Sequence, residues 1–182
     1  MIIDYRNFVN EKINKIFEKE YKNVMMYPKI IKLVFSSSFG LKGNNKAFLK
    51  EIFNDFYLIT GQKPVLIKSK KSVSNFGIRK GMISSIKITL RNKRMFNFIN
   101  KFINISVPRI RDFSGFKEDS VDYYGNFNFG CEDHTIFPEF FLDEKKIGYL
   151  KKGFNININI KNNKREDSLK ILKSINFPFT NV

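Results

Sequence analysis

Apolar residues recur every three or four positions in several parts of the chain, and this spacing predicts amphipathic helices. The helical segments span about residues 4–21, 48–60, 94–105 and a short stretch that opens at Glu166 and Asp167. Gly61 stands where a C-capping glycine belongs, with Pro64 three residues beyond, so the second helix is predicted to end at Thr60 or Gly61. Pro108 is predicted to end the third helix.

Segments with the residue pattern of β-strands lie between these predicted helices. Short β-branched runs or period-two alternation cover residues 29–35, 65–67, 86–90, 126–129 and 154–160. The last run is the cleanest, because Ile156, Ile158 and Ile160 alternate with asparagines. One face of that strand is predicted to be buried and the other to be polar.

The order of elements predicts the fold class. Strands that follow each other without an intervening helix pair antiparallel. We therefore predict an α+β fold, in which a mainly antiparallel sheet has helices packed on one face and a long basic loop between two central strands. The other sheet face is free to bind. A chain of 182 residues with 42% hydrophobic content is enough for one core, so a single domain over residues 1–182 is expected.

Positive charge is concentrated in the middle of the chain. Residues 56–111 contain no Asp or Glu and supply 13 of the 33 basic residues, and the formal net charge of the chain is +16. A surface of one sign repels itself unless a partner of opposite charge binds it, so a polyanion is the expected partner.

Residues 68–85 form a predicted loop that is longer than most strand connections. The loop combines five cations and five serines with Gly77, Gly81 and a central aromatic residue, Phe76. Cations neutralise phosphates, hydroxyl and N–H groups bond phosphate and sugar oxygens, and an exposed aromatic can stack on a base. The alternative is a solvated, flexible hairpin tip. The turn at residues 36–43, with Gly40, Gly43 and nearby Lys46, lacks the spacing of a nucleotide-binding phosphate loop.

The sequence gives little support for a catalytic function. Glu118, Asp119 and Asp122 have no histidine or further carboxylate at ligand spacing, and His134 is predicted to be a surface residue of a connector. Cys131 and His134 form a C-x-x-H pair without a second pair, so neither a zinc site nor any cofactor is predicted. The alternative, an RNA-processing enzyme, would use Asp112, Glu118, Asp119 or His134. A third hypothesis, a basic protein bound to an anionic membrane, would require a basic amphipathic helix, which the sequence lacks.

Cellular location is constrained by three features. The single cysteine allows no internal disulfide and favours a reducing compartment. The N-terminal residues show no secretory, transmembrane or import pattern, so we expect the protein to be used where it is made. Abundant Ile, Asn, Lys and Phe are typical of an A+T-rich genome.

Several motifs resemble one known family. The stretch GQKPVLIKSKKSVSNFGIRKGMISSIKITLRNKRMFNFI (61–99) is similar to the fifth ribosomal protein of the bacterial large subunit, a family that binds 5S rRNA. Further matches are SVPRIRDFSGF (106–116), GNFNFG (125–130), IFPE (136–139) and NFPF (176–179). The motifs follow one order over nearly the whole chain.

The resemblance implies a non-enzymatic, monomeric ribosomal protein of the central protuberance that binds 5S rRNA and large-subunit rRNA. Its rRNA-binding residues would be Ser36, Gln62, Lys63, Thr89, Arg91, Lys93, Arg94, Arg109 and Arg111. Its loop would face the peptidyl-site tRNA with Lys68, Lys70, Lys71, Ser72, Phe76, Arg79 and Lys80. A protein of the small-subunit head would be a further partner across an intersubunit bridge. A free-standing RNA-binding protein is the alternative within this class.

The chain departs from the family pattern at several places, among them Asn92-Lys93-Arg94 in place of G-E-R and a connector after Glu139 that is a few residues longer. Residues 35–40 read FSSSFG where relatives usually read L-N-M-G-V-G, and Tyr123-Tyr124-Gly125-Asn126 replaces G-R-G-N. Remodelled RNA contacts are expected there. Together with the compositional bias, the bacterial-type motifs predict an organelle-encoded protein, most simply of a protist mitochondrion, with the bacterial cytoplasm or a plastid as alternatives.

Overall fold

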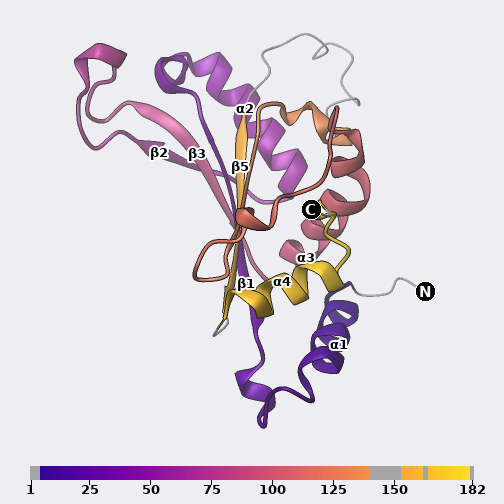
Figure 1. The fold of residues 1–182 in the computed structure, drawn as a ribbon. Coiled ribbons are helices and arrows are strands. Elements are labelled where there is room, and N and C mark those ends of the chain that lie inside the picture. Colours follow the sequence, from indigo (N-terminus) through magenta and orange to yellow (C-terminus); the bar gives the residue numbers. More distant parts are fainter. Residues whose placement is uncertain (1–4, 140–152, 162–163, 181–182) are drawn as a thin grey trace. The chain divides into compact units, whose positions relative to one another are not determined.

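A computed structural model describes residues 5–139, 153–161 and 164–180 (Figure 1). The helices are α1 (Tyr5–Phe17), α2 (Lys46–Thr60), α3 (Asn92–Lys101) and α4 (Arg165–Ser174). The strands are β1 (Lys29–Ser38), β2 (Val65–Lys68), β3 (Ile83–Leu90), β4 (Phe127–Cys131) and β5 (Phe154–Lys161). This order confirms the predicted sequence of elements. The sequence also predicts a lysine-rich turn around Lys145, Lys146, Lys151 and Lys152, and this turn lies outside the described residues.

The described strands form one sheet in the order β2-β3-β1-β5-β4, which confirms the α+β class with a mainly antiparallel sheet. β2 lies at the edge of this order, so the basic loop connects an edge strand to β3 and its predicted place between two central strands was wrong. β2 pairs antiparallel with β3, with Val65 opposite Lys87 and Leu66 opposite Ile86. Side chains alternate along β5 as predicted, since its isoleucines are buried while its asparagines reach solvent. Each strand that alternates in this way has one apolar face and one polar face.

The chain divides into two compact units. One unit contains Met1–Leu33, Arg91–Phe129 and Asn157–Val182, and the other contains Val34–Leu90 and Gly130–Ile156. β1, β4 and β5 each contribute residues to both units. The single-domain organisation expected from the chain length stays a prediction.

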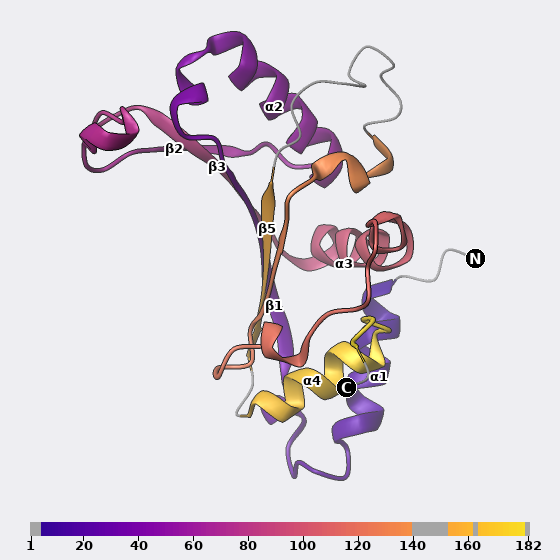
Figure 2. The ribbon, with the colours of Figure 1, turned by 45° about the horizontal axis from the view of Figure 1, so that its top comes forward.

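The first unit contains α1, α3 and α4, and α1 packs against both of the other helices (Figure 2). Its core is rich in phenylalanine. The Phe116 ring lies 4.8 Å from Phe129 and 5.2 Å from Phe127, centroid to centroid. Phe116 also exchanges backbone hydrogen bonds with the C-terminal segment, because its N–H donates to Pro178 O and its carbonyl accepts from Thr180 N. The phenylalanines of this unit thus build its core.

The second unit is organised around Phe35 of β1. Its ring centroid lies 5.0 Å from Phe56 on α2 and 5.0 Å from Phe154 on β5. α2 begins where the Asn45 side chain accepts from Ala47 N and ends at Gly61, which has a left-handed φ of 66°. The predicted glycine C-cap is therefore confirmed.

Several predicted boundaries were wrong. α1 ends at Phe17 rather than near Tyr21, because the chain turns there and brings the Tyr21 hydroxyl to Asp167. β1 continues through Ser38, where a turn was expected, because the Ser37 hydroxyl donates to Gly153 O and is satisfied inside the unit.

The third helix also differs from the prediction. Its α-helical part ends at Lys101, and the chain continues as a π-helical turn, Phe102–Ser106, and a 3-10 turn, Val107–Arg109. Pro108 lies in this closing 3-10 turn, so the helical run ends one residue beyond the predicted place, close to the proline that supplies no N–H to an α-helical ladder.

Candidate nucleic-acid interface

The basic loop is an extension of the β2–β3 hairpin. Its connecting part is shorter than the predicted 68–85, because Lys68 belongs to β2 and Ile83 to Ser85 belong to β3. Backbone hydrogen bonds continue beyond the strands: Ser69 N donates to Met82 O at 2.8 Å, and Gly81 N donates to Ser69 O at 2.9 Å. The hairpin is therefore built as a ladder rather than as an irregular loop.

A second pair of backbone bonds closes the tip. Val73 and Ile78 form an antiparallel bridge around the turn Ser74–Phe76, with N···O distances of 2.8 and 3.1 Å. Gly77 follows with φ 61°, and a Cβ there would meet Leu41 Cδ2 at 3.0 Å. Glycine suits this position because it adopts the left-handed conformation and lets the tip approach Leu41 closely. The tip is therefore a turn closed by backbone hydrogen bonds.

The hairpin presents its predicted RNA-facing side chains to solvent. Exposed residues are Lys68, Lys70, Lys71, Ser72, Phe76, Arg79 and Lys80. Phe76 is 68% exposed, although a phenyl ring in a monomeric protein is normally buried. The Ser72 hydroxyl accepts from Lys80 N at 3.0 Å and so helps to hold the two sides of the loop together. A ridge of cations with one exposed ring suits a phosphate backbone with an unpaired base.

Polar residues at the strand ends supply a second set of candidate contacts in the same unit. The Gln62 amide Nε2 donates to Thr89 O at 3.1 Å, so the structure brings these two predicted residues together. Ser36 and Thr89 are half-buried, and Lys63 is exposed. Gln62 therefore has a structural role at the end of β3 that sequence reasoning missed.

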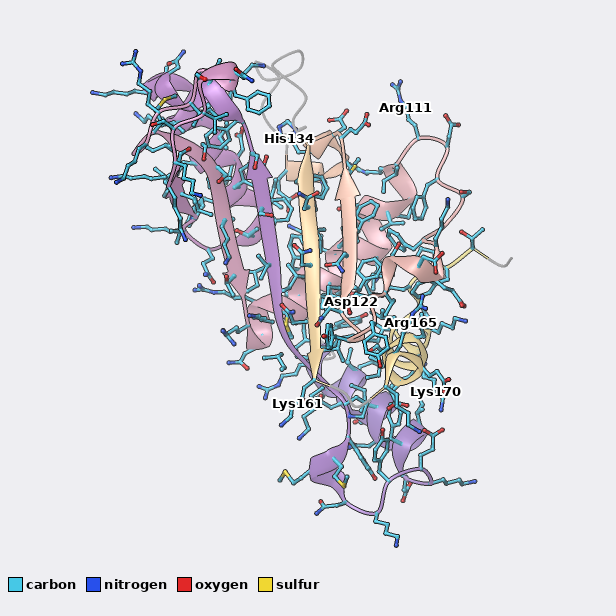
Figure 3. The ribbon with its side chains drawn as sticks, turned by 60° about the vertical axis from the view of Figure 1, so that its left-hand side comes forward. Arg111, Asp122, His134, Lys161, Arg165 and Lys170 are labelled. Carbon is cyan, nitrogen blue, oxygen red and sulfur yellow. The ribbon has the colours of Figure 1, made fainter. Side chains whose placement is uncertain are left out.

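The remaining predicted cations belong to the other unit. Arg91, Lys93 and Arg94 are exposed around the start of α3, and Arg109 and Arg111 are exposed after the π-helical turn. Arg111 projects from the connector that follows the helical run (Figure 3). The predicted rRNA-binding residues are thus divided between the two units.

The residues of the enzyme alternative are divided between the two units, with Asp112, Glu118 and Asp119 in the first and His134 in the second. His134 is only 5% exposed, so its prediction as a surface residue was wrong; the 3-10 turn that carries it is packed inside. Asp119 pairs with Arg165 at 3.2 Å and Glu118 with Lys173 at 2.6 Å. Burial raises the pKa of the Cys131 thiol, which makes it a poor nucleophile.

The described part of the chain contains neither a metal cluster nor a membrane-spanning helix. Within residues 5–139, 153–161 and 164–180, His, Cys, Asp and Glu nowhere gather in a group of three that could hold a metal ion. None of the described helices combines the length and apolar character needed to cross a membrane.

The polar sheet face carries amide pairs that the sequence did not predict. Asn157 Nδ2 donates to Asn128 Oδ1 at 2.6 Å, and Asn159 Nδ2 donates to Asn126 Oδ1 at 3.1 Å. The period-two pattern predicted that these asparagines face solvent, but their pairing depends on the register of β4 and β5.

Comparison with protein-family models gives two matches that together cover most of the chain. Residues 23–79 match the model of ribosomal protein L5, and residues 83–179 match the model of the C-terminus of the same ribosomal family. The boundary between the two matches falls within the basic hairpin.

Curated relatives match over similar lengths. The large ribosomal subunit protein uL5 of Helicobacter pylori (strain P12) is 38% identical over 178 residues, which cover 98% of this chain and 96% of the relative. The protein of the same name from Pelagibacter ubique is 41% identical over 159 residues, or 87% and 85% of the two chains. The Helicobacter acinonychis protein is 38% identical over 178 residues, which cover 98% of this chain and 96% of the relative.

Proposed function

The chain belongs to the ribosomal L5 protein family, and from this membership we propose that it is a structural constituent of the large ribosomal subunit that binds 5S rRNA and large-subunit rRNA in the central protuberance. Its relatives are named as ribosomal proteins rather than enzymes. The chain is accordingly a structural protein, and the RNA-processing alternative falls away.

The basic hairpin supports RNA binding most directly. It combines exposed cations with an exposed Phe76 on a hydrogen-bonded ladder, inside a stretch without acidic residues. Each cation that neutralises a phosphate releases counterions, so affinity should depend strongly on salt. A ladder holds these cations in place before RNA arrives, which reduces the entropy lost on binding.

Two finer roles are part of the proposal. The tip of the hairpin, including Lys70, Lys71 and Arg79, faces the peptidyl-site tRNA, while the strand ends and the cations around α3 contact rRNA. A protein of the small-subunit head is the proposed partner across the intersubunit bridge. The protein acts as a monomer within the ribosome.

Location is proposed as the ribosome of either an organelle or a bacterium. The relatives reported above are bacterial, which is consistent with the bacterial alternative. The mitochondrial assignment rests on composition and stays a prediction. Locating the gene tests it: a bacterial chromosomal or nuclear gene would overturn an organellar origin.

The decisive experiment strips native ribosomes with rising salt and follows the protein by mass spectrometry and the RNA by sequencing. Release of the protein together with a 5S-like RNA is the expected result. Absence of the protein from the large subunit would overturn the proposal. Release without a small RNA would retain ribosomal membership but remove 5S rRNA as the principal ligand.

A further inference from the structure

Two adjacent tyrosines project from a short hairpin in the first unit. Tyr123 is 86% exposed and Tyr124 is 76% exposed. Their ring centroids lie 5.5 Å apart and the ring planes meet at 85°. Two rings at a right angle form a corner in which a flat group can stack on one ring while its edge faces the other.

The backbone beneath the rings is tightly held. Gly125 N donates to Asp122 O at 2.9 Å, Asp122 N donates to Asn126 O at 2.9 Å, and Val121 bridges Phe127 at the base. The Asp122 carboxylate accepts from Asn126 N at 2.7 Å and from Asn126 Nδ2 at 3.0 Å. Neither tyrosine side chain is needed for this bonding. Their exposure on a fixed turn is thus unexplained by folding alone.

The turn continues into the amide pairs of the polar sheet face. Asn126 is bonded to Asp122 on one side and to Asn159 on the other, and the Asn157–Asn128 pair lies next along the two strands. Figure 3 places Asp122 near β4 and β5, with Lys161 at the end of β5. Amide groups both donate and accept, as the edges of nucleobases and the ribose hydroxyl do.

Two of the nearby acidic side chains pair with cations, Asp119 with Arg165 and Glu118 with Lys173. The Asp122 carboxylate accepts hydrogen bonds from Asn126 within the turn. The flanking exposed groups on β4 and β5 are amides and a lysine rather than aliphatic side chains. These amides supply hydrogen-bond donors and acceptors and the lysine supplies a positive charge, which together match the bases, ribose and phosphates of an RNA strand, so the surroundings favour RNA.

We propose that Tyr123 and Tyr124 form a stacking site for an unpaired RNA base, and that the Asn126–Asn159 and Asn128–Asn157 pairs contact the same strand. The inference rests on the proposed ribosomal function and deepens it, because it adds a contact in the unit that does not contain the basic hairpin. Stacking on an aromatic ring tolerates any base, so the site selects single-stranded structure before sequence.

The absence of tryptophan allows a direct test. Because the chain contains no Trp, Tyr124→Trp introduces a single fluorescent reporter that keeps an aromatic face. Its emission is followed as the full chain is titrated with a 5S rRNA transcript and, separately, with large-subunit rRNA from the source ribosome. Affinities of Tyr123→Ala, Tyr124→Ala and the two Phe variants are measured with the same RNAs.

The expected result is quenching of the Trp by one of the two RNAs. Each Ala variant should weaken that complex by about 5- to 150-fold, whereas the Phe variants should bind nearly as the wild type does. Circular dichroism verifies that the Ala variants are folded. Wild-type-like affinity of the folded Ala variants, without quenching, would overturn the stacking site while leaving the proposed function intact.

Two other outcomes separate the hypotheses. If the wild type binds neither RNA, the proposed function fails together with the stacking site. If the Trp is shielded in intact ribosomes but is not quenched by either RNA, the tyrosines contact a protein, and the RNA-stacking inference is wrong.

Discussion

The Tyr21 hydroxyl donates a 2.5 Å hydrogen bond to Asp167 Oδ2 across 146 positions of sequence. Asp167 lies in the first turn of α4 and is almost fully buried. Beside this bond, Lys170 Nζ lies 2.5 Å from Glu20 Oε1. The two contacts join the segment after α1 to α4, so two parts of the first unit that are far apart in sequence are held together.

Removing the tyrosine hydroxyl should destabilise this unit. In Tyr21→Phe the buried Asp167 carboxylate loses its donor, and a hydrogen bond to a charged group is worth about 1.5 to 3 kcal/mol. We expect a loss of about that size in the free energy of unfolding, measured by urea denaturation. Tyr27→Phe is the matched control, since Tyr27 is buried in the same aromatic cluster but its hydroxyl has no hydrogen bond among the described residues. Equal losses in both variants would contradict the assigned role.

The same contact predicts a dependence on alkaline pH. The hydrogen bond to Asp167, together with burial and the nearby carboxylates, raises the pKa of Tyr21 from 10.0 to about 12. A raised folded-state pKa contributes stability that is complete below pH 10.0, the unfolded value, and is lost as pH rises towards about 12.

The measurement is the difference in unfolding free energy between wild type and Tyr21→Phe across the pH range. It should be constant from neutral pH to about pH 9 and shrink above about pH 10. Burial also raises the pKa of Tyr5 to about 12, but Tyr5 is present in both proteins and cancels in the difference. A difference that stays constant up to about pH 12 would exclude the bond as its source.

Gly43 should be far less tolerant of a side chain than Gly61. A Cβ on Gly43 would lie 1.8 Å from the backbone oxygen of Ile83, whereas one on Gly61 would meet nothing within 4 Å. Gly43→Ala therefore forces the turn at Gly40–Asn44 away from β3, with an expected loss of about 3 kcal/mol or more. Gly61→Ala carries only the cost of its left-handed φ, about 1 to 2 kcal/mol. Thermal and urea denaturation of both variants test the ranking, and a smaller loss for Gly43→Ala would show that the turn adapts.

Gly43 also shows which features of the fold could be predicted from the sequence. The glycines after β1 lack the spacing of a phosphate loop, and the structure gives Gly43 a packing role against Ile83 instead. The element order was predictable because apolar periodicity is local: the isoleucines of β5 and the capping Gly61 each identify their element without distant information.

Features that depend on distant residues were not predictable. β1 extends through Ser37 because its hydroxyl bonds to Gly153, 116 positions away. His134 looked like a surface residue but is buried by packing that leaves no local signal. For the candidate site, composition identified the exposed cations and Phe76, while the Val73–Ile78 bridge that orders them follows from hairpin register. Local patterns therefore predicted which groups are available to bind, and tertiary register decided how they are held.

Charge reversal in the basic hairpin should separate RNA binding from folding. Lys70 and Lys71 are exposed, and within the described residues neither side chain forms an ion pair or hydrogen bond. The ladder around them consists of backbone bonds such as Ser69 N to Met82 O. Lys70→Glu and Lys71→Glu should therefore leave the melting temperature almost unchanged.

RNA affinity should fall in the same two variants. Affinity falls as salt rises, and each lost phosphate contact is expected to make the plot of log K against log salt concentration less steep by about 0.7 to 0.9. The double variant should bind RNA on the order of tenfold more weakly, or worse. Lys50→Glu on α2 is the matched control, because it makes the same charge change on an exposed residue of the same unit, outside the hairpin. A fall in melting temperature for the hairpin variants would mean that these lysines support the fold. An equal loss of affinity in Lys50→Glu would show that net charge, rather than the hairpin, attracts the RNA.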